Sequence, residues 1–295
     1  MEYRFGEWQF NPEHLVLYRD DCNRDELTKL FRALDVRRKC NIVDKLLHES
    51  LCLENIRAGV WNPIGICPTY SCDLRCNYCG YSSEAKKTMP VEMRTVEVFL
   101  ADVIKRYIVS RHLKRINTPL TLFISGGGEP TYEWDLLKDI VSYFNRLCVM
   151  HGITGHINLT TNGLLNDTQL EFLANNVQEV MVSYDGLPYI QNNNRPSANG
   201  KPTSSIVENT IRRLSNAKLK LTVRSTLWPD TYEEMQHIYI NLCSLISNMD
   251  NFTWSVNPVA YEGRAMEHKG CMFRRDFVPY YLNFVTYIVK RYGNI

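Results

Sequence analysis

Long apolar segments and a strong net charge are both missing from this sequence of 295 residues. It contains no run of eighteen apolar residues, which is what a membrane-spanning helix would need. Its formal net charge of +2 does not supply the broad basic surface that binds nucleic acid. We therefore expect no membrane span and no broad nucleic-acid-binding surface.

A secretory signal is also missing, because the opening MEYRFGEWQF lacks a charged stretch followed by an apolar one. The chain nevertheless contains ten cysteines. Without export to an oxidising compartment, clustered cysteines bind metal more often than they form disulfides. We therefore expect a cytoplasmic protein whose cysteines are reduced or ligate a metal.

Beyond residue 60, strand-like apolar runs alternate with amphipathic helical patterns. The predicted strands cover residues 62–70, 119–127, 156–163, 179–186, 219–227 and 251–259. The predicted helices cover residues 91–112, 134–151, 167–176, 203–217, 231–247 and 275–291. Because a helix follows each strand, the pattern predicts a parallel sheet built from right-handed crossovers.

The chemistry of the strand ends favours a curled sheet over a flat one. The strands end in polar or glycine-rich stretches such as SGGGEP, TTNG and SYDG, and a (β/α) barrel gathers its active site at this rim. The GxGxxG turn of a doubly wound nucleotide-binding fold does not follow the first strand. Six units are too few to close a barrel of eight. The predicted fold is therefore α/β, an open partial (β/α)6 TIM-like barrel over residues 61–275.

The two ends of the chain do not show this alternation of predicted strands and helices. Residues 1–60 carry a mixed-charge helical pattern at 23–56, which predicts an N-terminal, mainly helical accessory segment. Residues 276–295 belong to a predicted helix that is apolar on most sides, and such a helix needs partners on two faces. We expect either a further domain beyond Ile295 or a second chain docked on this helix.

Three cysteines, Cys72, Cys76 and Cys79, lie within eight positions in the spacing CxxxCxxC. Thiolates suit zinc, copper or iron–sulfur clusters. A structural zinc site needs four ligands, usually as two separated pairs, and the nearest further thiol, Cys67, falls in the preceding predicted strand. A [4Fe–4S] cube with three cysteines leaves one iron open to another ligand. The triplet predicts such a cluster, and a zinc knot with a remote fourth ligand is the alternative.

The cysteine triplet, with the sequence GGEP at 127–130 after the next strand, resembles the radical S-adenosylmethionine enzymes. The resemblance implies that the open iron chelates S-adenosylmethionine (AdoMet). An electron from a reductant such as a flavodoxin or ferredoxin would then cleave AdoMet to methionine and a 5′-deoxyadenosyl radical. It also implies that Tyr78 contacts the cofactor, that the methionine lies close to Gly127 and Gly128, and that Glu129 lies near its ammonium group.

Further candidates for cofactor contact stand at the ends of later strands. Asn162 and Ser183 could hydrogen-bond the ribose and the carboxylate of AdoMet, although each is also an ordinary turn residue beside a glycine. Arg195 and Arg224 are candidate partners for the carboxylate, because a guanidinium matches a carboxylate with two hydrogen bonds. We favour Arg224 slightly, because its strand is predicted to aim at the same rim.

The stretch that begins VSYDG resembles one branch of that family, the peptide and protein maturases that include the anaerobic sulfatase-maturating enzymes. Its matching positions are Ser183, Asp185, Gly186, Arg195, Pro196 and Gly200. Where that branch prefers His-Asp, this chain has Gln191 and Asn192, so the resemblance assigns no role to that pair. The resemblance implies radical modification of a peptide or protein side chain by hydrogen abstraction.

The same branch usually continues into a cysteine-rich SPASM domain with auxiliary clusters. After the triplet this chain has only the widely spaced Cys148, Cys243 and Cys271, which cannot build one. Residues 1–60 could recognise a leader peptide or simply cap the barrel. Two other functions stay open: radical chemistry on RNA or a small molecule, and a non-catalytic iron–sulfur or metal module for electron transfer.

Overall fold

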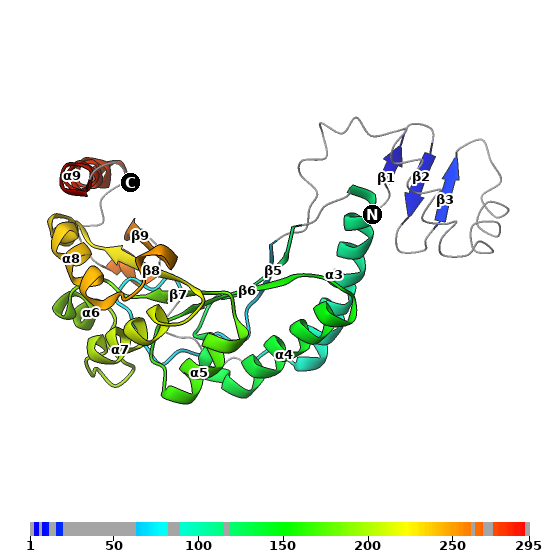
Figure 1. Ribbon diagram of the computed structural model, residues 1–295, viewed down its shortest axis with the longest axis horizontal. Coiled ribbons are helices and arrows are strands. Elements are labelled where there is room, and N and C mark those ends of the chain that lie inside the picture. The colour runs from blue at the N-terminus through cyan, green and yellow to red at the C-terminus, as the bar shows by residue number, and fades with distance from the viewer. Residues whose placement is uncertain are drawn as a thin grey trace. The chain divides into compact units, whose positions relative to one another are not determined.

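The computed structural model describes residues 3–5, 8–11, 16–19, 63–81, 89–114, 118–260, 263–267 and 274–292 (Figure 1). The chain divides into two compact units. One unit comprises Met1–Trp61 with Ile108–Asn117, and the other comprises Asn62–Tyr107 with Thr118–Ile295. All the predicted site residues belong to the second unit.

The described part of the first unit includes an antiparallel sheet. Its strands are β1 (Tyr3–Phe5), β2 (Trp8–Asn11) and β3 (Val16–Arg19), in the order β1-β2-β3. The sequence analysis did not predict these strands, although aromatic and polar residues alternate in YRF and WQF, a strand pattern. The predicted helical stretch at 23–56 lies outside the described residues.

The second unit contains six parallel strands in chain order, β4-β5-β6-β7-β8-β9. Their bounds are β4 (Ile64–Ile66), β5 (Leu120–Ile124), β6 (Gly155–Thr161), β7 (Glu179–Ser183), β8 (Lys220–Leu227) and β9 (Phe252–Pro258). The first and last strands do not pair with each other, so the sheet is open. This confirms the predicted open α/β barrel.

The helices follow the strands as the sequence predicts, with one addition. Their bounds are α3 (Met93–Lys114), α4 (Trp134–Met150), α5 (Asp167–Asn176), α6 (Pro188–Asn194), α7 (Ser204–Ser215), α8 (Met235–Leu245) and α9 (Arg274–Tyr292). The added helix is α6, which begins at a proline, a residue that suits a first helical turn. It has only seven residues and ends in three asparagines, so the sequence offers little apolar periodicity to find it.

The core of this unit lies between the sheet and the helices on its outer side (Figure 1). In β5 the alternate residues Leu120, Leu122 and Ile124 are fully buried, whereas Thr121 and Phe123 are half-buried on the other face. This alternation follows from the two-residue period of a strand. The apolar face of α4, including Phe144, is buried in the same layer. The opposite face of the sheet is thus left free to line a cavity.

Helix α9 buries one face and exposes another. Phe277 and Phe284 are buried on it, and they contact the rings of Tyr232 and Trp254. A second face leaves apolar side chains exposed, among them Val278, Tyr281, Leu282 and Val289. The partner that the sequence analysis expects for this face stays a prediction. Within the described ranges, no helix has the length and hydropathy to cross a membrane.

Candidate functional site

A cavity of about 390 Å³ lies where the carboxyl ends of β5, β6 and β7 meet the loop that carries Cys72, Cys76 and Cys79. We call this loop the cysteine loop. All three cysteines of the triplet line it, together with Gly127, Gly128 and Glu129 of the GGEP strip. Its wall includes Tyr70, Cys72, Cys76, Tyr78, Cys79, Gly126, Gly127, Gly128, Glu129, Thr160, Thr161, Asn162, Ser183, Arg195 and Arg264. The structure therefore brings every predicted site residue except Arg224 to a single cavity.

The cysteine loop is held in place by the segment that follows α6. The backbone N–H groups of Arg75 and Asn77 donate to the carbonyl oxygens of Pro196 and Asn194, both at 2.9 Å. Leu74, which is 2% exposed, forms an isolated antiparallel bridge with Ser197. These contacts join two stretches more than a hundred residues apart. They fix the backbone that carries the three thiols.

The three thiols are free and half-buried. Burial raises the pKa of the Cys72 thiol to about 12, and burial likewise raises the pKa of Cys76. Thiolates at these positions therefore need a cationic partner, which a metal centre would supply. No three acidic, histidine or cysteine side chains in the described part of the chain are grouped as ligands of one metal ion. In a cube each cysteine binds a different iron, so the donor set fits a cluster without converging on one point.

The glycines before Glu129 are required by close contact with the approach to the cysteine loop. A Cβ at Gly128 would lie 2.2 Å from the carbonyl oxygen of Ser71, and one at Gly127 would lie 2.0 Å from the ring of Tyr70. The backbone N–H of Glu129 donates to that same carbonyl oxygen of Ser71 at 2.8 Å. Gly127 and Gly128 therefore set the position of the cysteine loop. They also line the cavity, where the sequence predicts the close approach of a ligand.

Glu129 is 2% exposed and accepts four hydrogen bonds. Its Oε1 accepts from the N–H and hydroxyl of Thr131 and from the hydroxyl of Thr161, whereas Oε2 accepts only from the N–H of Asn162, at 2.6 Å. Burial raises its pKa to about 7, and the four hydrogen bonds oppose that rise. The carboxylate thus ties the end of β5 to the end of β6, and only Oε2 keeps room for a further donor.

Asn162 has both halves of its amide occupied by the protein. Its Nδ2 donates to Asp73 Oδ1 at 2.6 Å, and its Oδ1 accepts from the N–H of Leu164 at 2.9 Å. Asp73 lies in the cysteine loop, next to Cys72. The side chain predicted to bind the ribose therefore joins the end of β6 to the loop, and its contact with AdoMet stays a prediction.

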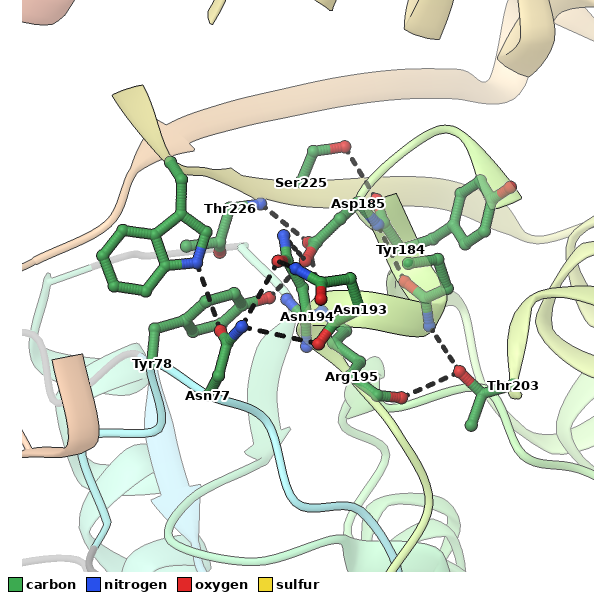
Figure 2. Close-up of polar contacts among 12 residues, drawn as sticks. Asn77, Tyr78, Tyr184, Asp185, Asn193, Asn194, Arg195, Thr203, Ser225 and Thr226 are labelled. Carbon is green, nitrogen blue, oxygen red and sulfur yellow. Dashed lines mark hydrogen bonds and ion pairs between the residues drawn. The ribbon is translucent and has the colours of Figure 1, made fainter. Parts of the chain in front are cut away.

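Asp185 is the centre of a second group of contacts, drawn in Figure 2. It is fully buried and accepts from the Tyr78 hydroxyl at 2.5 Å and the Asn194 amide at 3.2 Å through Oδ2. Its Oδ1 accepts from the guanidinium of Arg195 at 3.1 Å and the backbone N–H of Thr226 at 3.0 Å. The carboxylate thereby links the cysteine loop, the segment after α6 and strand β8. We call these five residues the Asp185 clasp.

Charge and ring contacts hold the side chains of Tyr78 and Arg195 within the clasp. Burial is the main reason that the pKa of the Tyr78 phenol lies well above its ordinary value, so the phenol is the donor to Asp185. Burial works against the charge of Arg195, but the charge and hydrogen bond of Asp185, together with Tyr78 and Cys76, outweigh it and keep the pKa of Arg195 above its usual range. The guanidinium carbon of Arg195 lies 5.2 Å from the centre of the Tyr78 ring, a cation–π geometry. On the other side, Trp228 lies 6.3 Å from that ring and donates to Asn77 at 3.1 Å.

Gln191 and Asn192, which replace the His-Asp of the resembled branch, both have structural partners here. Gln191 accepts from the N–H of Asp185 at 3.0 Å and donates to the hydroxyl of Thr203 at 3.1 Å. Asn192 Oδ1 accepts from the N–H groups of Thr203 and Ser204, both at 2.9 Å, at the start of α7. The pair therefore supports the clasp and caps a helix.

The two remaining candidates, Ser183 and Arg224, differ in whether they line the cavity. Ser183 lines the cavity, and its hydroxyl makes no hydrogen bond with any described residue. Arg224 pairs with Ser183 in the sheet but is exposed and is not part of the cavity wall. The wall is built from the ends of β5, β6 and β7 beside the cysteine loop, and it includes no residue of β8. The sequence analysis missed Arg264, which lines the cavity from a turn after β9.

Comparison with known proteins places the part of the chain that carries most of the site in one family. A profile described as the Radical SAM superfamily matches residues 66–240, which is more than half of the chain and includes the cysteine triplet, the glycine strip and the clasp. The chain belongs to the radical SAM superfamily. A cysteine-type anaerobic sulfatase-maturating enzyme of Clostridium perfringens is 27% identical over 171 residues, which cover 57% of this chain and 44% of that relative.

Solved structures show the same fold. The sulfatase-maturating enzyme anSMEcpe with bound AdoMet and Kp18Cys peptide has a TM-score of 0.63 at 19% identity, covering 79% of this chain and 63% of that one. Streptococcus suis SuiB bound to precursor peptide SuiA has a TM-score of 0.55 at 14% identity, covering 99% of this chain and 68% of that one. The radical SAM chain described here spans less than half the length of the curated relatives it matches.

Proposed function

We propose that this chain holds one [4Fe–4S] cluster on Cys72, Cys76 and Cys79 and cleaves AdoMet at that cluster in order to modify a peptide or protein side chain. One observation carries the proposal: the three cysteines and Gly127, Gly128 and Glu129 of the GGEP strip line the same cavity of about 390 Å³. The wall contains no fourth thiol from the described residues. A cluster held by three cysteines supplies an open iron for AdoMet and the electron that cleaves it to methionine and a 5′-deoxyadenosyl radical.

The chain's own residues position the reactants and exclude water. The Asp185 clasp and the Gly128 contact hold the cysteine loop rigid, so that the three ligands keep their spacing. Glu129 holds the ends of β5 and β6 together and keeps Oε2 available for the ammonium group of AdoMet. The hydroxyl of Ser183 faces the cavity as a donor for a carboxylate. These groups act by orientation, whereas the bond cleavage is the chemistry of the cofactor.

The peptide substrate is the finer part of the proposal. It is supported by relatives and neighbours of the same fold: a sulfatase-maturating enzyme, a structure of anSMEcpe with a peptide, and a structure of SuiB with a precursor peptide. A flavodoxin or ferredoxin would deliver the electron.

The cluster is tested by anaerobic reconstitution with iron and sulfide. C72A, C76A and C79A should each lose the charge-transfer absorbance of the cluster, whereas C148A and C243A, whose thiols lie outside the cavity, should keep it. With dithionite and AdoMet, the wild-type chain should release 5′-deoxyadenosine. A triplet variant that keeps a full [4Fe–4S] signal would refute the ligand assignment. A stable cluster that releases no 5′-deoxyadenosine would instead favour an electron-transfer module.

The substrate class is tested separately, by adding candidate peptides to the reduced, reconstituted chain. A peptide substrate should stimulate release of 5′-deoxyadenosine and change in mass by the loss of hydrogen or the formation of a cross-link. An RNA or small molecule that does so, while no peptide does, would replace the peptide part of the proposal and leave the AdoMet chemistry intact.

A further inference from the structure

Three exposed tyrosines adjoin the cavity beside the cysteine loop. Tyr70 lies two positions before Cys72, Tyr81 lies two positions after Cys79, and Tyr132 follows the GGEP strip. All three line the cavity, and they are 48%, 53% and 52% exposed. The rings of Tyr70 and Tyr81 meet edge to face, with their centres 6.2 Å apart. The surface next to the cluster ligands is therefore aromatic and open to solvent.

Arg75 adds a positive charge to this surface. Its side chain is exposed and lines the same cavity. Its Nη1 donates to the carbonyl oxygen of Cys72 at 2.9 Å and to that of Leu74 at 2.7 Å, which holds the guanidinium on the cysteine loop. No described carboxylate forms an ion pair with it. We call Tyr70, Arg75, Tyr81 and Tyr132 the loop face.

The charged residues around the cavity favour an acidic partner. The described part of the wall contains three arginines, Arg75, Arg195 and Arg264, and one carboxylate, Glu129, which is 2% exposed. Arg195 is paired with Asp185, and Arg264 is half-buried. The exposed charge of this part of the wall is therefore that of Arg75. An acidic partner would be attracted to the loop face, and a basic one would be repelled.

The composition and place of the loop face suit an electron-donating protein. Tyrosine and arginine are enriched at protein interfaces, and electron-transfer complexes are often weak and bury less than about 1,200 Å² in total, so a small face suffices. AdoMet does not account for the exposed arginine, because two cationic groups and one carboxylate give it a net positive charge. Since Tyr70 and Tyr81 flank the cysteine triplet, a donor bound here would lie next to the cluster ligands.

We propose that the loop face is the docking surface for the protein that reduces the cluster, an acidic electron carrier of the flavodoxin or ferredoxin type. The inference rests on the proposed function, because it requires the cluster as the electron acceptor. In the encounter the carrier is oxidised by one electron and the cluster is reduced by one, and no bond forms or breaks. Arg75 supplies electrostatic attraction, and the tyrosine rings supply apolar contact.

The test compares two electron donors on the anaerobically reconstituted full chain without AdoMet. One is a fully reduced, acidic flavodoxin, and the other is photoreduced deazaflavin, which is small and uncharged. R75Q and Y81A should each lower the rate of cluster reduction by flavodoxin about threefold to tenfold and keep the wild-type rate with deazaflavin. Added salt should slow reduction by flavodoxin more in the wild type than in R75Q. Stopped-flow absorbance measures the rates, and titration calorimetry should show a parallel loss of affinity for oxidised flavodoxin.

R213Q and Y189A are the matched controls. They make the same changes as R75Q and Y81A in exposed side chains that lie outside the cavity wall. Both should match the wild type with either donor. An equal loss in the controls and in the loop-face variants would overturn the inference.

A loss with flavodoxin in R75Q or Y81A that deazaflavin does not share supports the inference. Wild-type rates with flavodoxin in both variants would overturn it, and so would an equal loss with both donors, which would indicate a changed cluster. If R75Q holds no iron, Y81A decides in the same comparison. A wild-type chain that deazaflavin reduces but flavodoxin neither binds nor reduces would overturn the inference and leave the proposed function intact. A chain that assembles no cluster would overturn both.

Discussion

The phenol of Tyr78 donates a 2.5 Å hydrogen bond to Asp185, a residue 107 positions further along the chain. Tyr78 stands between two cysteines of the triplet, and Asp185 follows strand β7. The cysteine loop is therefore tied to the rim of the sheet by a buried carboxylate that Arg195 neutralises. In this arrangement, the geometry of the cluster ligands depends on residues that lie far from them in sequence.

Asp185→Asn should destabilise the chain strongly, because it leaves the buried Arg195 without a counter-charge. The side chains of this pair are 0% and 9% exposed, and breaking a buried pair from one side costs about 3–5 kcal/mol. Tyr78→Phe should cost less, about 1.5 kcal/mol, because it removes one donor of four. Urea unfolding of the apo chain measures both losses.

Asp167→Asn is the matched control, since it makes the same change in the exposed Asp167–Arg213 pair. There the side chains are 80% and 51% exposed, and the expected cost is at most about 1 kcal/mol. Equal losses for the Asp185 and Asp167 variants would mean that the clasp does not hold the loop.

The parallel sheet and its helices could be predicted because their signal is local. Apolar residues two apart in a strand, or three and four apart in a helix, show which face is buried without knowledge of the partner. The strands 119–127 and 179–186 were therefore found in sequence, with ends that the structure trims by a few residues to Leu120–Ile124 and Glu179–Ser183. Helix α6 is short and rich in asparagine, so its sequence has no comparable apolar period from which to predict a helix.

The candidate site was predictable only where its residues are close in sequence. The spacing of the cysteines and the GGEP strip indicate soft-metal chemistry and close backbone approach directly. The bond from Asn162 to Asp73 and the packing of Arg264 against Cys79 join residues far apart in the chain, and no local pattern encodes them. The rim position of Arg224 was inferred from its strand alone, but its side chain is exposed and no residue of β8 lines the cavity.

Gly128→Ala should displace the cysteine loop. The new Cβ would lie 2.2 Å from the Ser71 carbonyl oxygen and 2.5 Å from the Tyr70 carbonyl carbon, both backbone atoms that cannot turn aside. Gly127→Ala should be milder, because its overlap is with the ring of Tyr70, which is 48% exposed and can move. Iron bound per chain after reconstitution should fall several-fold for the first variant and little for the second.

Gly65→Ala provides the control for these variants, because a Cβ at that position in β4 would meet nothing within 4 Å. Its iron content should equal that of the wild type. Full iron loading by Gly128→Ala would contradict the role of the strip in positioning the loop.

Ser183→Ala should weaken AdoMet binding about fivefold to tenfold without loss of iron. The hydroxyl lines the cavity without a partner among the described residues, and one hydrogen bond to a bound carboxylate contributes about 1–1.5 kcal/mol. Arg224→Gln should leave the affinity unchanged, because its side chain is exposed outside the cavity wall. Equilibrium binding of AdoMet to the oxidised, reconstituted chain compares the two. A weaker Arg224 variant beside a normal Ser183 variant would reverse this assignment.

The buried carboxylate of Glu129 should make the stability of the apo chain fall as pH rises from about 4.5 to about 7. Burial raises its pKa from the ordinary 4.5 to about 7, so the unfolded chain ionises this group first. Below pH 4.5 the group is protonated in both states, and its favourable contribution is fully present. Over the interval, the unfolding free energy of the wild type should drop by about 3 kcal/mol relative to that of Glu129→Gln.

Urea unfolding at several pH values between 4 and 8 tests this difference in unfolding free energy. Only the change of the difference with pH is compared with the prediction, because the amide of Glu129→Gln also alters the hydrogen bond with Asn162. Glu171→Gln, on the exposed surface of α5, makes the same chemical change and is the control variant. Four hydrogen bonds favour the ionised form of Glu129 and therefore oppose the rise of its pKa caused by burial. If they outweighed burial, the carboxylate would ionise below its ordinary pKa. The wild type would then gain stability relative to Glu129→Gln as pH rises, which contradicts the prediction.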